Sequence, residues 1–165
     1  MHEEEIKKIK ELAGAFQRIN GKVILLSLLR KAKNEYDKFQ FAQCKASCEE
    51  ILKANSTNSS ALRGLGCVEQ AEGNLKKAIE YYKKALENSE HKEIEYTLIG
   101  MAYYLQEDFE NAIENYNLAI DINDDYDKAY EGKNQAMLER HVQILDLQDS
   151  LIKREKLSWI WRNTI

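Results

Sequence analysis

The sequence predicts an all-α protein built as a stack of antiparallel helix pairs. One pattern occurs twice between Ser59 and Ile122, with an offset of 34 residues, and a fixed period of this length is typical of stacked helical repeats. The matched residues are Gly66 and Gly100, Ala78 and Ala112, Tyr82 and Tyr116, and Ala85 and Ala119. The composition agrees, because the 165 residues include no proline and 32% of them are charged, which favours helices.

Residues 1–21 are predicted to form an N-terminal capping helix. Acidic residues 3–5 suit the first turn of a helix, and Asn20-Gly21 is predicted to end it because glycine readily adopts positive φ. A narrow apolar stripe runs along this segment, formed by Ile6, Ile9, Leu12, Ala13 and Phe16. We expect the stripe to pack on the first helix pair, since the ends of a stack must be covered.

Three helix pairs are predicted, over residues 22–57, 58–91 and 92–126, so that the chain has about eight helices. Breaks are expected near 20–22, 38–40, 55–59, 73–75, 89–92, 107–109 and 123–127. Gly66 and Ala78 let two helices approach closely, and Tyr82 fills the wider gap one turn along. The first pair is degenerate, with Cys44, Cys48 and Ile51 standing 34 residues before Ala78, Tyr82 and Ala85.

Residues 127–165 are predicted to form a C-terminal capping helix and an aromatic tail. The pattern stops at Lys133 and Asn134, as expected of a terminal helix with a polar outer face. The consecutive Trp159, Ile160 and Trp161 cannot all be buried on one helix face. The tail therefore packs as part of the cap, docks on another copy or a further domain, or stays free until a partner arrives.

Several function classes are not favoured. The net charge of −4 argues against nucleic acid as the partner, and the longest apolar run, Val23–Leu26, is too short for a membrane span. The three cysteines are expected to be reduced, packed thiols, and the start lacks the features of a signal peptide, which predicts a cytoplasmic protein. No phosphate loop, metal motif or nucleophile motif is present. We expect no catalytic residue, no metal and no cofactor.

The pattern over Ser59–Ile122 resembles the tetratricopeptide repeat family. The resemblance implies a right-handed superhelix with a concave groove, and a non-catalytic interaction module that acts as an adaptor, a scaffold or a chaperone-like protein. In the first pair, Asn34 and Tyr36 resemble the family's Asn and aromatic positions only if the turn near Phe39-Gln40 is one residue short. The implied groove residues are Arg30, Asn34, Arg63, Cys67, Gln70, Ile94, Thr97, Met101, Tyr104 and Leu105.

This groove has a basic end and an apolar end, which suits a peptide or helix of another protein with some acidic and some apolar residues. The family's clamp for heat-shock carboxylates is broken, because Gly64, Ile94 and Leu98 replace three of its members. There are two alternatives. The chain is a self-associating structural protein that forms a homodimer through the aromatic tail, or it is the repeat portion of a larger enzyme. The layout also resembles type III secretion translocator chaperones, with Gly64-Leu65-Gly66 and Gln70-Ala71 compatible with them.

Overall fold

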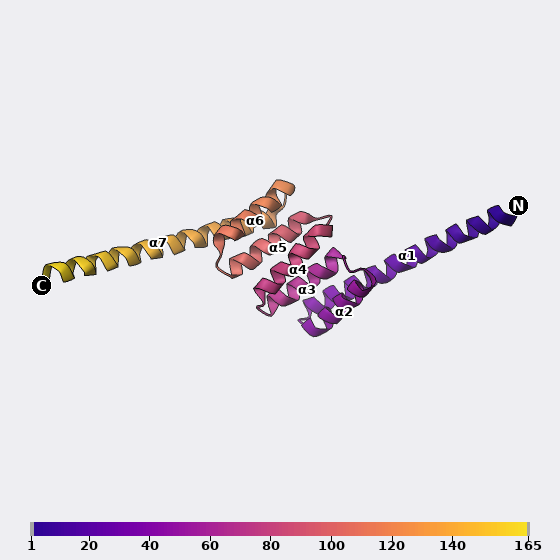
Figure 1. Ribbon diagram of the computed structural model, residues 1–165, viewed down its shortest axis with the longest axis horizontal. Helices are drawn as coiled ribbons and strands as arrows, with labels where there is room; N and C mark the ends of the chain where they lie inside the picture. The colour runs from indigo at the N-terminus through magenta and orange to yellow at the C-terminus, as the bar shows by residue number, and fades with distance from the viewer. Residues whose placement is uncertain (1, 165) are drawn as a thin grey trace. The chain divides into compact units, whose positions relative to one another are not determined.

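The computed structural model describes the backbone of residues 2–164, and the side chains in this range except those at 2–10, 12, 13, 16, 20, 157, 158 and 160–164. All secondary structure in residues 2–164 is helical, as predicted (Figure 1). The seven helices are α1 (His2–Asp37), α2 (Phe41–Ala54), α3 (Ser59–Ala71), α4 (Leu75–Asn88), α5 (Lys92–Leu105), α6 (Phe109–Ile122) and α7 (Asp127–Thr164). They form two compact units, Met1–Ser89 (unit 1) and Glu90–Ile165 (unit 2).

The turn inside each helix pair has the same backbone geometry in all three pairs. Phe39, Gly73 and Glu107 adopt left-handed φ values of 58°, 82° and 61°, and they are spaced at the 34-residue period of the sequence. The residue that follows each of them donates its backbone N–H to a carbonyl five residues earlier, over 2.8–3.0 Å. The first pair therefore turns in the same register as the other two. The match of Asn34 and Tyr36 to the family's Asn and aromatic positions, which required a turn one residue short, is therefore wrong.

Six of the seven expected helix breaks are present, and the exception is the one at Asn20-Gly21. α1 passes through this point without interruption, so the separate N-terminal capping helix and the eighth helix are wrong. Glycine in a helix interior costs only about 1 kcal/mol relative to alanine. The apolar stripe predicted to pack as a cap lies outside the described side chains, so its packing stays a prediction.

The core of unit 1 lies where α1, α2 and α3 meet. From α2 it takes Cys44, Cys48 and Ile51, which are the degenerate residues of the first pair. Burial is the main cause that raises the pKa of the Cys48 thiol to about 12, so this sulfur is a packing group at neutral pH. Ala32 of α1 is buried at the position equivalent to Gly66 and Gly100, where the sequence also requires a small residue.

In unit 2, α5 and α6 form a pair on which the first part of α7 packs. Tyr116 of α6 is the central side chain, and it is only 3% exposed. A Cβ added at Gly100 of α5 or at Gly132 of α7 would lie within 3.0 Å of its ring. Glycine is thus needed on both helices, although the 34-residue period from Gly100 leads to Asn134 and not to Gly132.

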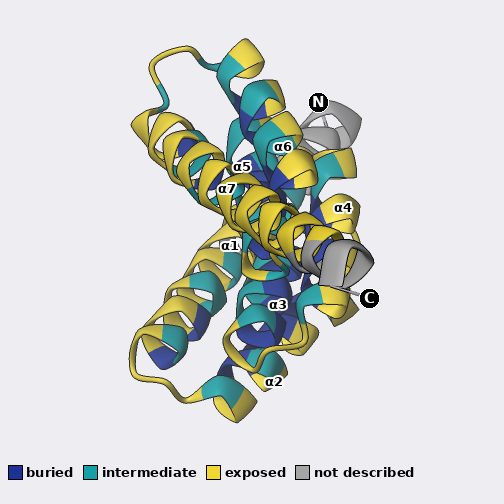
Figure 2. Cartoon of the chain, turned by 90° about the vertical axis from the view of Figure 1, so that its left-hand side faces the viewer, coloured by how far each residue is buried: buried dark blue, intermediate teal, exposed yellow. Residues whose placement is uncertain are grey.

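The second half of α7 is exposed along most of its length (Figure 2). α7 continues as one helix to Thr164, through the predicted aromatic tail. Trp159 is 65% exposed. The side chains of Ile160 and Trp161 lie outside the described residues, so the choice between cap and interface for this part of the tail stays a prediction.

Candidate interaction surface

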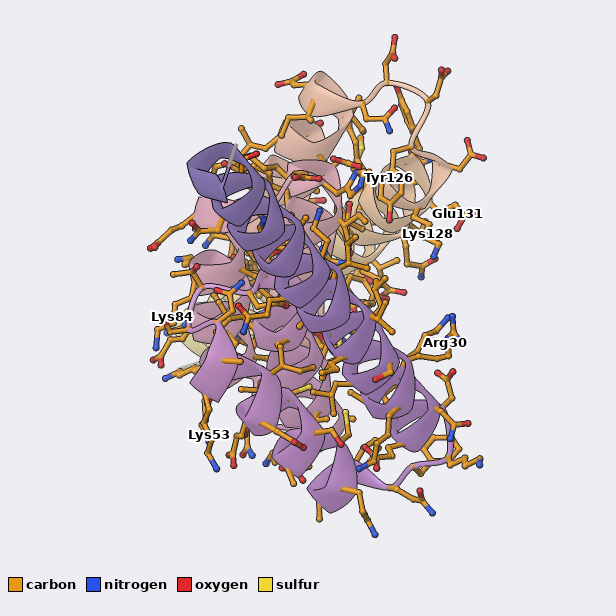
Figure 3. The ribbon with its side chains drawn as sticks, turned by 90° about the vertical axis from the view of Figure 1, so that its right-hand side faces the viewer. Arg30, Lys53, Lys84, Tyr126, Lys128 and Glu131 are labelled. Atoms are coloured by element: carbon orange, nitrogen blue, oxygen red, sulfur yellow. The ribbon has the colours of Figure 1, made fainter. Side chains whose placement is uncertain are left out.

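Unit 1 has two distinct sides, one carrying the first helices of its pairs and the other the second helices. α1 and α3 are the first helices, and they contact each other. Figure 3 shows Arg30 of α1 pointing away on one side of unit 1, and Lys53 of α2 and Lys84 of α4 pointing away on the other. The predicted binding residues of this unit all belong to α1 and α3, the helices of the first side.

Arg30 and Asn34 are exposed on α1, whereas Arg63, Cys67 and Gln70 are half-buried on α3. The amide oxygen of Gln70 accepts a hydrogen bond of 3.1 Å from the hydroxyl of Tyr82, so part of this side chain serves the packing of the pair. Because the first turn keeps the common register, the α1 equivalents of these three α3 residues are Leu29, Lys33 and Tyr36. Arg30 and Asn34 therefore each stand one residue after an equivalent position, Leu29 and Lys33 respectively.

The predicted binding residues of unit 2 all lie on α5, and they differ in accessibility. Met101 and Leu105 are 37% and 49% exposed, and Ile94 is half-buried. Thr97 is buried, and its hydroxyl donates a 2.8 Å hydrogen bond to the carbonyl oxygen of Glu93 in the same helix. Tyr104 packs against Phe109 of α6, with 5.7 Å between ring centroids. Met101 and Leu105 are therefore the α5 side chains best placed to meet a partner.

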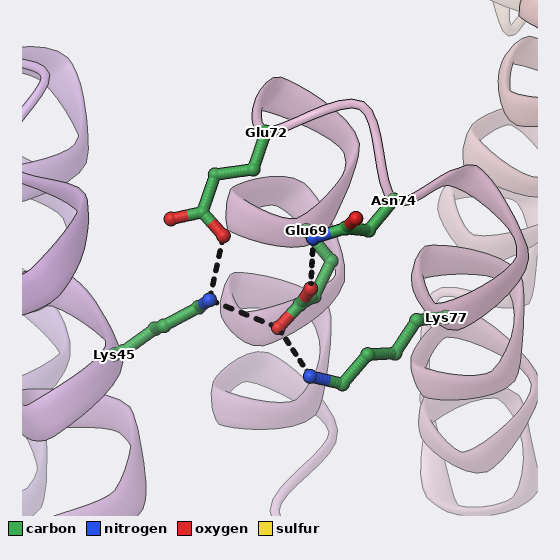
Figure 4. Close-up of polar contacts among 5 residues, drawn as sticks. All are labelled: Lys45, Glu69, Glu72, Asn74 and Lys77. Atoms are coloured by element: carbon green, nitrogen blue, oxygen red, sulfur yellow. Dashed lines mark hydrogen bonds and ion pairs between the residues drawn. The ribbon is translucent and has the colours of Figure 1, made fainter.

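A cluster of charged residues joins three helices of unit 1 (Figure 4). Glu69 of α3 is 2% exposed, and its Oε1 lies 3.0 Å from Lys45 Nζ of α2 and 2.8 Å from Lys77 Nζ of α4. The side-chain amide of Asn74 donates a 2.9 Å hydrogen bond to Oε2 of Glu69. Oε2 of Glu72 lies 2.7 Å from Lys45 Nζ. Burial alone would raise the pKa of Glu69. The hydrogen bonds from Lys77, Lys45 and Asn74 outweigh burial and lower this pKa to about 2.

We expect Glu69→Gln to lower the free energy of unfolding by about 2 kcal/mol at pH 7, because it removes hydrogen bonds between charged groups. The stabilisation from the ionised Glu69 is complete above its ordinary pKa of 4.5 and is lost as the pH falls from 4.5 towards about 2. Urea unfolding at several pH values measures this. The wild type should lose stability over that range more steeply than the variant.

Glu72→Gln is the matched control, since Glu72 contacts the same Lys45 but its side chain is 35% exposed. Exposed ion pairs contribute little, so this change should cost less than about 1 kcal/mol. Equal losses from the two variants would show that the buried position of Glu69 is not what makes the cluster stabilising.

Sequence reasoning missed both the Glu69 cluster and the apolar surface of α7. In the repeat pattern, Glu69 stands at the position of Tyr103, which gives no reason to expect an ion pair. Lys45 and Glu69 are 24 positions apart, so no short sequence motif indicates that they meet. α7 exposes a large set of apolar side chains, which comprises Tyr130, Met137, Leu138, Val142, Ile144, Leu145, Leu147, Leu151, Ile152 and Trp159. Their spacing predicts a helix, but whether another helix covers these side chains depends on the tertiary structure.

Two further features concern the chemistry that the described residues could support. Within them, no group of three or more histidine, cysteine, aspartate or glutamate side chains could hold a metal ion. The described helices also include none whose length and hydropathy would let it cross a membrane.

Two stretches of the chain, residues 59–91 and 96–126, match models of the tetratricopeptide repeat. No curated protein matches the sequence. Among solved structures, a mutant O-GlcNAc transferase from Thermobaculum terrenum is 21% identical with a TM-score of 0.64, and the match covers 68% of this chain and 22% of the transferase. This chain therefore spans about a fifth of that protein's length.

Two further structures have similar folds and little sequence identity. The first tetratricopeptide domain of human RPAP3 is 12% identical with a TM-score of 0.66, over 72% of this chain and 93% of that domain. The first such domain of Spaghetti (RPAP3), described as bound to the HSP90 peptide SRMEEVD, is 12% identical with a TM-score of 0.63, over 69% of this chain and 90% of that one. At these identities the similarity shows the fold alone.

Proposed function

Since the chain is a tetratricopeptide repeat protein, with repeats at residues 59–91 and 96–126, we propose that it is a non-catalytic module that binds peptide segments of other proteins. The observation that carries this proposal is the exposure of Met101 and Leu105, which stand one helical turn apart on α5. The same helix buries Ile99, Gly100 and Ala102 in unit 2, so its exposed apolar side chains are not required by its own core. Exposed apolar side chains of this kind serve as anchor sites for peptides and helices.

The charges of unit 1 indicate the chemistry of the ligand. Arg30, Lys31 and Lys33 are exposed on α1, the first helix of that unit. A segment with acidic residues and one or two apolar side chains would match the features that the two units offer separately. The Spaghetti domain binds a peptide of mixed acidic and apolar character, SRMEEVD, which supports the same kind of ligand.

A heat-shock carboxylate is a poor candidate for that ligand. Besides the missing clamp residues, the space at one clamp position is already occupied. A Cβ added at Gly64 would lie 2.7 Å from the sulfur of Cys48, so a larger side chain there would have to displace α2 core atoms. We therefore expect the peptide SRMEEVD itself to bind weakly or not at all, as measured by fluorescence anisotropy.

Affinity capture with Leu105→Asp tests the proposal. We expect this variant to lose the proteins that the wild-type chain captures from a cell extract, because an aspartate cannot fill an apolar pocket on a partner. The matched control is Leu118→Asp on α6, since Leu118 is 38% exposed and belongs to the other helix of the pair. Circular dichroism checks that both variants keep their helices.

Two results would contradict the proposal. If Leu105→Asp captures the same proteins as the wild type, α5 is not part of the binding surface. If Leu118→Asp alone loses them, the second helices carry the site instead.

A further inference from the structure

α1 carries two separate apolar faces, and only one of them is used by the core of unit 1. Leu25, Leu28, Leu29 and Tyr36 pack against that core, where Ala32 is buried. On another face, Ile19, Val23 and Leu26 are 59%, 59% and 62% exposed. At about 100° of rotation per residue, this second face points roughly 140° away from the first. A partner could therefore lie along α1 without displacing any helix that packs on it.

The exposed face belongs to a heptad pattern. Ile19, Val23 and Leu26 are separated by four and three residues, and the sequence continues the same alternation towards the N-terminus. The complete set of positions is Ile9, Leu12, Phe16, Ile19, Val23 and Leu26. An unbroken alternation of three and four residues is the a/d pattern of a left-handed coiled coil, and what such a surface binds is another helix.

The surroundings of this face leave room for a long partner helix. α1 has 36 residues and is about 54 Å long, whereas its neighbour α2 has 14 residues and is about 21 Å long. The first part of α1 thus extends beyond α2. In that part, Ile19 of this face and the neighbouring Lys22 are exposed.

The charges at the two ends of the heptad pattern identify the partner. In the sequence, the pattern is extended by Glu5 at its N-terminal end, within the acidic run at positions 3–5. It is extended by Arg30 at its C-terminal end, where Lys31 and Lys33 follow, and these three basic residues are exposed. Glu5 of one copy would meet Arg30 of a second copy that runs in the opposite direction, so the charges at these two pattern positions favour an antiparallel partner.

We propose that α1 is a dimerisation helix, which pairs with α1 of a second copy in an antiparallel coiled coil. In this register every a position meets a d position of the other copy. Ile9 lies opposite Leu26, Leu12 opposite Val23, and Phe16 opposite Ile19, each counted from one copy to the other. The next layer at each end places Glu5 opposite Arg30. A parallel pair would instead place Glu5 against Glu5 and Arg30 against Arg30, which is repulsive.

The apolar face of α7 is a weaker candidate for the same role. Its side chains form two columns with a spacing of seven, which are Met137, Ile144 and Leu151, and Leu138, Leu145, Ile152 and Trp159. Between them, one helical turn along, stand His141, Gln148 and Glu155. With Val142 and Leu147, the alternation of three and four extends over only three apolar positions in α7 (Leu138, Val142, Leu145, and Ile144, Leu147, Leu151), against six in α1.

Sedimentation equilibrium of the full chain tests the proposal. We expect the wild type to form a dimer, Val23→Glu to be monomeric, and both to have the same helicity by circular dichroism. The matched control is Leu145→Glu, an apolar residue of α7 that is 49% exposed, and this variant should remain dimeric. A wild type that is monomeric at high micromolar concentrations overturns the proposal. So does a dimer that survives Val23→Glu and is lost in Leu145→Glu.

Charge reversal tests the direction of the pairing. Arg30→Glu should weaken the dimer roughly tenfold, because two exposed ion pairs become repulsive. The double variant Glu5→Arg with Arg30→Glu should restore the wild-type affinity. If the dimer is parallel, Arg30→Glu only exchanges one like-charge pair for another. Unchanged affinity in this variant therefore refutes the antiparallel arrangement.

Cysteine cross-linking gives an independent reading of the register. Chains with Leu12→Cys mixed with chains with Val23→Cys should form a disulfide between the two variants. Val23→Cys alone should not, because in the antiparallel pair its two copies are separated by 11 residues, about 16 Å along the axis, and a disulfide needs Cα atoms within about 7 Å. Rapid cross-linking of Val23→Cys alone overturns the proposed direction.

Discussion

Replacing Tyr116 with alanine should lower the free energy of unfolding of unit 2 by about 3–5 kcal/mol, the range measured for large aromatic side chains removed from cores. Tyr116 is 3% exposed, and its ring fills the space left by glycines on two different helices, Gly100 of α5 and Gly132 of α7. Its removal leaves a cavity at the point where α5, α6 and α7 meet. The helices cannot close this cavity without moving relative to one another.

Urea unfolding followed by circular dichroism measures the effect, and Tyr116→Phe is the control. Phenylalanine keeps the ring and removes only the hydroxyl, whose pKa burial raises to about 12. The Phe variant should lose less than about 1.5 kcal/mol. If the alanine variant loses no more than the phenylalanine variant, the ring does not hold α7 on the helix pair.

Replacing Gly66 with leucine is expected to have the second largest effect, a loss of about 1–3 kcal/mol from overpacking. A Cβ at this position would lie 2.6 Å from Cδ1 and 3.1 Å from Cζ of Tyr82, which is fully buried. The ring has no room to move, because it packs between α3 and α4 and its hydroxyl donates to Gln70. The two helices would have to separate, which would also disturb the Glu69 cluster between them.

Gly21→Leu is the matched control for this substitution. It places the same side chain in a helix interior where nothing lies within 4 Å, so only the higher helix propensity of leucine acts. This variant should be more stable than the wild type by up to about 1 kcal/mol. A similar melting temperature for Gly66→Leu and the wild type would mean that α3 and α4 are not in close contact at Gly66.

The sequence by itself determined the second and third helix pairs and the turns inside them. The turns depend on local chemistry, such as Gly73 with its positive φ and Asp108, which accepts a hydrogen bond from the backbone of Asn111. The close contacts at Gly66 and Gly100 were also predictable, because the small residues and the tyrosines that face them recur at one fixed spacing. Each of these features is indicated either by residues close together in the sequence or by residues that recur every 34 positions.

Only the tertiary structure decided the features that depend on residues far apart or on a small balance of energies. Lys45, Glu69 and Lys77 come together because three helices pack, and a list of charged residues gives no hint of this pairing. Gly132 matters because α7 meets Tyr116 two positions before the one that the 34-residue period gives, which is Asn134. At Gly21 the sequence predicted a break, but glycine in a continuous helix costs only about 1 kcal/mol relative to alanine. α1 is continuous there, and no turn geometry places Gly21 at positive φ.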